Sequence, residues 1–312
     1  MEFLSAIGPF LGIGLLGALF SRFTGVNMSM CMLMLFLYLG ARPGEAIVAM
    51  LLFNAFTFFT TYSQEHAMNM KNFTFFPGVR FIIPVAITVV LAALSPFAGI
   101  IFFIIVFLME IFARQYREMD AKTRPAKGKI VQMCVIASLC AVVGVALVPL
   151  ISETYYYAVS GMVILAFSVL MWLAGDRRKW TGAWDKILYA AAFFAGVCGF
   201  DTSDWLQAMK RSNPSPLSQS YSIVMHTAIM VALVAAYALY RYFPLSALFT
   251  TVGAAVGIRF FGIYVHSSKG KFSYVTLSLA VLAALVFMII QPEPAGLPVL
   301  PESEQSPSFF NF

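Results

Sequence analysis

Five ionisable side chains interrupt long apolar runs and are the residues of this chain best placed to do chemistry: Arg22, Asp201, Asp204, His226 and Arg259. An ionisable group surrounded by hydrocarbon costs roughly 2.5–3.5 kcal/mol on insertion scales, so each one is a functional candidate by default. Arginine offers a forked donor that suits a planar or tetrahedral oxyanion, and histidine can change its charge near neutral pH. These residue types together predict an anion site with a titrating partner.

Polar side chains gather at two breaks in the apolar runs, Gly25–Ser29 and Gly199–Asp204. Freed backbone N–H groups and helix N-termini at such breaks favour an anion. We predict that the coupling of a proton or ion falls to Asp201, Asp204 and His226. The residues predicted to bind the substrate are Arg22, Thr24, Asn27, Ser29, Asn54, Thr202, Ser203 and Arg259.

The same side chains also have purely structural interpretations. Arg22 is either an anion ligand, a side chain that snorkels to the headgroups, or the ion-pair partner of Asp201. Arg259 is either a ligand or a snorkelling cation, and His226 is either a titrating group or a hydrogen-bonded packing residue. Glu110 precedes Arg114 by one helical turn, a spacing that predicts an ion pair between them near the edge of the membrane.

The sequence lacks the spacing of any familiar catalytic or metal site. It contains no Walker A, HExxH or GxSxG sequence and no metal-spaced set of histidines and cysteines. Glycines 12, 14 and 17 predict close helix contact rather than phosphate binding. We expect no cofactor, no metal, no enzyme activity and no nucleic-acid partner. The cysteines form no CxxC pair and are predicted to be small core residues: Cys31, Cys134, Cys140 and Cys198.

The composition identifies the elements that must position these residues. Of 312 residues, 61% are hydrophobic and 11% are charged, and the mean hydropathy is +0.85. A soluble domain has roughly a quarter charged residues, and a disordered chain has low hydrophobicity. At about 20 residues for each crossing, this length holds roughly eight to ten membrane helices.

Glycine, proline and polar residues divide the apolar sequence into candidate spans. Segments 3–40 and 184–215 each contain a break and are longer than one crossing needs. We therefore predict an all-α polytopic membrane protein with about eight full spans and two broken, re-entrant helical segments. The apolar runs are 3–20 with 28–40, 45–63, 79–95, 97–114, 129–151, 154–174, 184–199 with its continuation to about 210, 219–240, 244–264 and 272–290.

The basic loops predict the orientation of these spans. Residues 114–129 and 176–186 are rich in lysine and arginine, which is typical of cytoplasmic loops, and this places the turn at Glu153 outside. If segment 184–215 is re-entrant, Lys269 and Lys271 also lie inside, as the charge rule prefers. We expect a multi-pass protein of the cell membrane, most simply the bacterial inner membrane.

The two broken segments align with one another. Gly25–Ser29 can be laid over Gly199–Ser203, and Glu45–Asn54 over Leu217–His226. Because the spans after each break would run in opposite senses, the alignment predicts an inverted-topology repeat, an arrangement that secondary transporters use around a substrate site near the midplane. The predicted parts are a first repeat at 1–117, a central pair of spans at 118–183, a second repeat at 184–290 and a Pro-rich flexible tail at 291–312.

The stretches Gly12–Val26 and Leu39–Ala46 resemble the start of the sulfite-exporter (TauE/SafE) family of membrane permeases. Ala195–Gly199 looks like the second copy of the same broken helix, and Gly253–Gly257 is similar to the family's penultimate helix. The chain departs from the family where glycines follow each break, and the spans at 129–174 look like an extra pair. Both departures bear on substrate identity.

The residues and the resemblance together predict a secondary transporter, a permease or exporter. The substrate class that the resemblance implies is a sulfur oxyanion, a sulfonate or a similar small organic anion, with coupling to a proton or another ion. A passive channel for a small solute and a non-transporting membrane subunit are the alternatives. The expected partners are the anionic substrate and the lipid bilayer.

Overall fold

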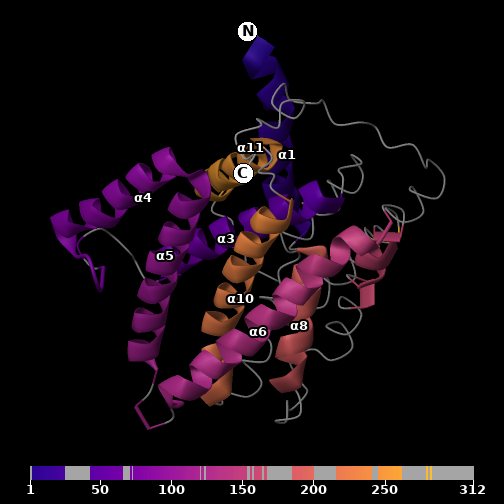
Figure 1. The fold of residues 1–312 in the computed structure, drawn as a ribbon. Helices are drawn as coiled ribbons and strands as arrows, with labels where there is room; N and C mark the ends of the chain where they lie inside the picture. The colour runs from indigo at the N-terminus through magenta and orange to yellow at the C-terminus, as the bar shows by residue number, and fades with distance from the viewer. Residues whose placement is uncertain are drawn as a thin grey trace.

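The structure, a computed structural model, describes residues 2–24, 43–65, 71–166 with short gaps, 185–199, 216–240 and 245–261, together with 279 and 282. Every regular element in these residues is helical, as predicted (Figure 1). The elements are α1 (Glu2–Thr24), α3 (Pro43–Glu65), the 3-10 turn η2 (Gly78–Phe81), α4 (Ile82–Leu94), α5 (Pro96–Glu118), α6 (Lys127–Leu147), the 3-10 turn η3 (Val148–Leu150), α8 (Asp185–Cys198), α10 (Pro216–Tyr240) and α11 (Leu245–Phe261).

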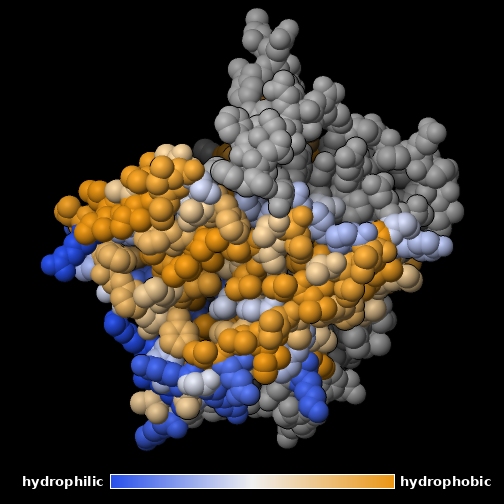
Figure 2. Space-filling view, in the orientation of Figure 1, coloured by the Kyte–Doolittle hydropathy of each residue, from blue (hydrophilic) through white to orange (hydrophobic). Residues whose placement is uncertain are grey.

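The length and apolar composition of the described helices are consistent with a membrane protein. Phe97–Glu118, Lys127–Leu150 and Ser220–Tyr240 are long and apolar enough to cross a membrane, and shorter apolar helices accompany them. Figure 2 shows apolar side chains in a broad band across the molecule and hydrophilic ones gathered along one edge below it. The predicted span at 272–290 and the second half of the one at 154–174 lie outside the described residues, apart from 279 and 282.

Three helices establish the two ends of the bundle. We call the end that carries residues 114–129 the basic end. Helix α6 begins there and runs parallel to α10, whose Tyr240 hydroxyl donates to the Val145 carbonyl at 3.1 Å at the other end. Helix α5 runs antiparallel to α10, because the ring of Phe97 stacks on that of Tyr237 with 5.2 Å between centroids, whereas the last turns of α5 reach the first turns of α10 at the basic end.

The remaining core helices divide by direction. Helix α3 begins opposite the basic end, where Gly44 faces the ring of Tyr240, and α11 starts there too because it follows α10 after a short link. Helix α1 runs parallel to α11, and α8 ends against Met50 near the start of α3. Thus α1, α3 and α11 run toward the basic end, while α6, α8 and α10 run away from it.

Glycines allow α1 and α11 to cross at close range. A Cβ atom at Gly14 would lie 2.1 Å from the carbonyl oxygen of Thr250, and one at Gly253 would lie 2.2 Å from that of Leu11. Small residues let helix backbones approach in this way, which maximises van der Waals contact where hydrophobicity gives no advantage over lipid. The predicted role of Gly14 is confirmed, whereas a Cβ at Gly12 would meet nothing within 4 Å.

A second glycine crossing joins α6 to α8. A Cβ at Gly144 would lie 2.4 Å from the carbonyl oxygen of Phe193, and one at Gly196 would lie 2.1 Å from that of Ala141. Each of the two opposed sets of helices therefore contains one crossing in which glycine on both partners removes the side chains from the contact.

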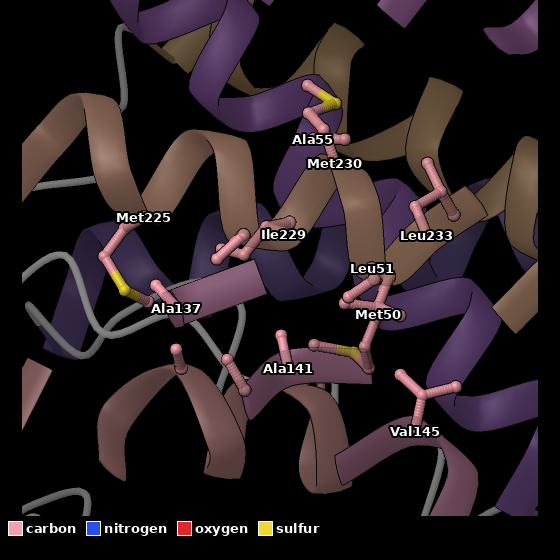
Figure 3. Packing of buried hydrophobic residues seen from close by; sticks show 14 of the residues in the cluster. Met50, Leu51, Ala55, Ala137, Ala141, Val145, Met225, Ile229, Met230 and Leu233 are labelled. Carbon is pink, nitrogen blue, oxygen red and sulfur yellow. The ribbon is translucent and has the colours of Figure 1, made fainter. Parts of the chain in front are cut away.

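The core is built around α10, which packs on α3, α5, α6 and α8. Alanine and methionine are prominent at this interface, because small and flexible side chains fill gaps between closely spaced helices. Figure 3 shows side chains from α3, α6 and α10 meeting in one interior: Met50, Leu51, Ala55, Ala137, Ala141, Val145, Met225, Ile229, Met230 and Leu233.

Helix α4 and helix α5 form a hairpin held by a buried carboxylate. Glu110 is 2% exposed and pairs with Arg114 at 3.2 Å, as its spacing predicts. Its two oxygens also accept the Thr74 amide at 2.9 and 3.0 Å, which the sequence did not indicate. The carboxylate thereby ties the segment before α4 to α5. Most apolar side chains of α4 are exposed, as expected for a helix that contacts lipid.

Candidate functional site

Helix α8 stops inside the protein at the predicted break. Its last residue is Cys198, and the amide of Gly199 donates to the carbonyl of Ala195 at 2.8 Å. Gly199 has φ +67°, the left-handed conformation that closes many helices and that glycine adopts without strain. Since Gly199 is buried, the end of this helix lies within the bundle rather than at its surface.

Asn54 binds this helix end from α3. Its side chain is 0% exposed, and its Nδ2 donates to the carbonyl oxygen of Gly199. A buried carbonyl beyond the last turn of a helix needs a donor, because leaving it unpaired costs about 1–3 kcal/mol. The predicted site residue Asn54 is therefore placed at the second break, to which it bonds directly.

Alanine at Gly199 tests how tightly this helix end is held. We expect Gly199→Ala to lower the free energy of unfolding by about 2–3 kcal/mol, because the left-handed backbone costs about 1 kcal/mol and the new Cβ would lie 2.6 Å from the Cβ of Met50. Gly78→Ala is the matched control, since Gly78 has φ +64° with nothing within 4 Å of its Cβ position. Equal midpoints for the two variants in thermal unfolding would show that Gly199 is not packed against α3.

The structure describes the chain only up to the edge of the predicted first break. Helix α1 ends at Thr24, with Arg22 in its last turn, directly before the predicted break at Gly25–Ser29. Arg259 lies near the end of α11. The side chains of Arg22, Thr24 and Arg259 lie outside the described part of the chain, as do the following predicted site residues in full: Asn27, Ser29, Asp201, Thr202, Ser203 and Asp204.

His226 is buried on α10 at 6% exposure. Its Nδ1 contacts the backbone carbonyl of Ser222 one turn earlier, and the Ser222 hydroxyl lies 3.4 Å from the same nitrogen. The hydroxyl in turn accepts from Gln115 Nε2 on α5 at 3.1 Å. The structure thus supports the hydrogen bonding expected of His226 and adds a residue, Gln115, that the sequence analysis did not single out.

The signal for Gln115 is present in the sequence but weak. It is an amide near the basic end of an otherwise apolar helix, where polar side chains are ordinary.

Among the described residues, no three His, Cys, Asp or Glu side chains are grouped as a metal site would require.

Helices α1 and α8 present the same electrostatic end to the two predicted breaks. Both α1 and α8 reach their break with a C-terminus, which carries about half a negative charge. The half-helix N-termini that the sequence predicts for an anion would fall in residues 25–42 and 200–215, outside the described chain. The described end of α8 therefore suits a cation, a proton or a neutral donor such as Asn54.

No protein-family model, curated protein or solved structure matches this chain.

Proposed function

We propose that this protein is a secondary transporter of a small anion, of the sulfur oxyanion or sulfonate class, coupled to a proton or another ion. Two inverted halves would rock about the breaks near Asn27 and Asp201. The observation that carries the proposal is the buried end of α8, where Gly199 leaves the helix and Asn54 from α3 binds its carbonyl. Irregular backbone at membrane depth is tolerated where it is buried in protein or lines a cavity, and transporters place their substrate there.

The directions of the core helices support an inverted repeat. If α1 corresponds to α8 and α3 to α10, as the sequence alignment has it, each pair runs in opposite senses across the bundle. The glycine crossing of α1 with α11 then corresponds to that of α8 with α6. This scheme revises the predicted division: α6 takes the place of α11 and moves from the central pair at 118–183 into the first repeat, and the α4–α5 hairpin replaces 129–174 as the inserted pair.

Two polar features of the core support the coupling of anion transport to a proton: the C-terminal end of α8 and the side chain of His226. The C-terminal end of α8 attracts a cation or a proton, and His226 on the facing helix α10 is a titratable group in the same bundle. When a proton and an anion bind to one buried site, each lowers the electrostatic cost of the other, so their binding is mutually favourable. A passive channel has no need of this linkage.

Anion binding measured at several pH values tests both the class of ligand and the coupling of anion binding to a proton. We expect sulfite, sulfate, thiosulfate or taurine to raise the thermal midpoint of the purified protein, and more so as pH falls from about 7 to about 6. His226→Gln should keep the shift and flatten its pH dependence, whereas His66→Gln and His266→Gln should leave it unchanged. A panel with no shift for any anion would overturn the substrate class, and a parental pH profile in His226→Gln would remove His226 from the coupling.

A further inference from the structure

Four cations at the basic end have no carboxylate partner among the described residues. Helix α5 ends there and α6 begins there, and both belong to segments long and apolar enough to cross a membrane. Figure 1 places the link between them at the lower edge of the molecule, where Figure 2 shows hydrophilic side chains. Glu110 neutralises Arg114, whereas in the part of the chain that the structure describes no carboxylate pairs with Arg117, Arg124, Lys127 or Lys129.

The ring of Tyr116, in the last turn of α5, holds two of these cations. The guanidinium carbon of Arg124 lies 4.8 Å from the ring centroid, and Nζ of Lys127 lies 5.4 Å from it. A cation within about 6 Å of an aromatic centroid is attracted by the charge distribution of the ring. The same ring stacks on that of Phe112, one turn earlier on α5, with 5.7 Å between centroids. Tyr116 therefore holds two positive charges where the apolar helix meets the polar link.

Arg124 is also bonded to the backbone at the end of α5. Its Nη2 donates to the carbonyl oxygens of Arg117 at 3.2 Å and Met119 at 2.9 Å, since basic side chains readily satisfy the last carbonyls of a helix. The link thereby folds back on the helix end and brings Arg124 and Lys127 to one ring. Two cations held so close repel each other, and an anion bound to both would relieve the repulsion.

An exposed apolar ridge on α6 begins one turn after Lys127. It consists of Val131, Val135 and Leu139, which follow at intervals of four residues and are therefore neighbours along one side of the helix. Their side chains are 51%, 52% and 61% exposed. An apolar surface next to paired cations suits an amphiphile, with an anionic head at the cations and an acyl chain on the ridge. A free anion would make no use of the ridge, and an acidic protein surface would not enter the apolar band.

We propose that the paired cations over Tyr116 and the α6 ridge bind an anionic phospholipid. The phosphate of its headgroup lies at Arg124 and Lys127, and an acyl chain lies along the ridge. Clusters of about four to eight lysines and arginines directly beside a membrane helix are typical of sites for anionic lipid headgroups. This inference rests on the membrane location of α5 and α6 and not on transport, so the two proposals can fail independently.

Native mass spectrometry of the full-length protein in detergent measures its affinity for single lipid molecules. We expect dioleoyl phosphatidylglycerol to bind about tenfold more tightly than dioleoyl phosphatidylcholine, because its net negative charge meets the paired cations. Lys127→Gln should reduce this preference about fivefold, the contribution of one cation near an anionic headgroup. Arg80→Gln makes the same change in net charge at an exposed arginine outside the link and should keep the parental preference.

Tyr116→Leu separates the role of the ring from that of charge alone. It retains every cation, yet we expect it to reduce the preference for phosphatidylglycerol about fivefold, because the side chain of Lys127 must then be ordered at the moment of binding. Tyr116→Phe retains the aromatic ring and is the matched control, which should bind phosphatidylglycerol as the parent does.

The soluble probe sn-glycerol 3-phosphate, which carries a phosphate but no acyl chain, distinguishes a lipid site from a free-anion site. At the concentration of the lipid it should displace no phosphatidylglycerol, and displacement would overturn the lipid assignment. Equal affinities of the parent for the two lipids, a parental preference in Lys127→Gln or Tyr116→Leu, or an equal loss in Arg80→Gln would also overturn the proposal. The expected lipid preference in a protein that moves no anion would refute the transport function and leave the lipid site standing.

Discussion

Replacing Gly14 with alanine separates α1 from α11 and lowers the free energy of unfolding by about 3 kcal/mol. The new Cβ would lie 2.1 Å from the carbonyl oxygen of Thr250 and 2.6 Å from the amide nitrogen of Ala254. Both atoms belong to helix backbone, which cannot rotate aside as a side chain does. The two helices must therefore move apart along the most extensive contact between any two of the described helices. The thermal unfolding midpoint of the purified protein in detergent measures this loss.

Gly12→Ala provides the control on the same helix. A Cβ at Gly12 would have nothing within 4 Å, and alanine is favoured over glycine inside a helix by about 1 kcal/mol. We expect Gly12→Ala to be neutral or slightly stabilising. If both variants unfolded at the parental midpoint, the close crossing of α1 and α11 would be wrong, and with it the parallel set of α1, α3 and α11.

Arg22→Gln is expected to abolish anion binding. In the proposed site, two half-helix N-termini would supply about half a positive charge each, and Arg22, in the last turn of α1, would supply a full charge. Without Arg22, little offsets the cost of dehydrating the anion or the negative charge of Asp201. The measurement is the anion-induced shift of the thermal midpoint, with sulfite, sulfate, thiosulfate and taurine as probes.

Arg80→Gln is the matched control for charge, because Arg80 is exposed on η2 and belongs to neither segment that contains a predicted break. It should leave the anion shift at its parental size. If Arg22→Gln bound anions as well as the parent did, the site would have to lie elsewhere, and Arg259 near the end of α11 would be the next candidate.

The helix ends were predictable because they depend on local chemistry. Gly199 and the polar residues after it predicted the end of α8, and the observed helix stops one residue before that glycine. Pro43 and Pro96 mark the first residues of α3 and α5, since proline suits the first turn of a helix. The predicted ion pair of Glu110 and Arg114 needed only their spacing on one helix.

The contacts between helices could not be predicted from the local sequence, as the helix ends could. These helices are apolar on nearly every face, so no polar stripe indicates which side turns inward. The bond from Asn54 to Gly199 joins residues 145 apart in sequence, and that from Gln115 to Ser222 depends on the angle at which α5 crosses α10. Asn54 could be chosen as a candidate only through its place in the repeat, whereas nothing local distinguished Gln115.

Counterflow in reconstituted vesicles tests the transport function most directly. Vesicles that contain the protein and are loaded with an unlabelled anion, sulfite or taurine, are diluted into a trace of the radiolabelled anion. A carrier exchanges the two, so we expect label to accumulate transiently above its equilibrium level with the parent and Arg80→Gln, and no accumulation with Arg22→Gln. Label that enters without an overshoot, or that does not enter at all for any anion of the panel, would contradict a carrier of small anions.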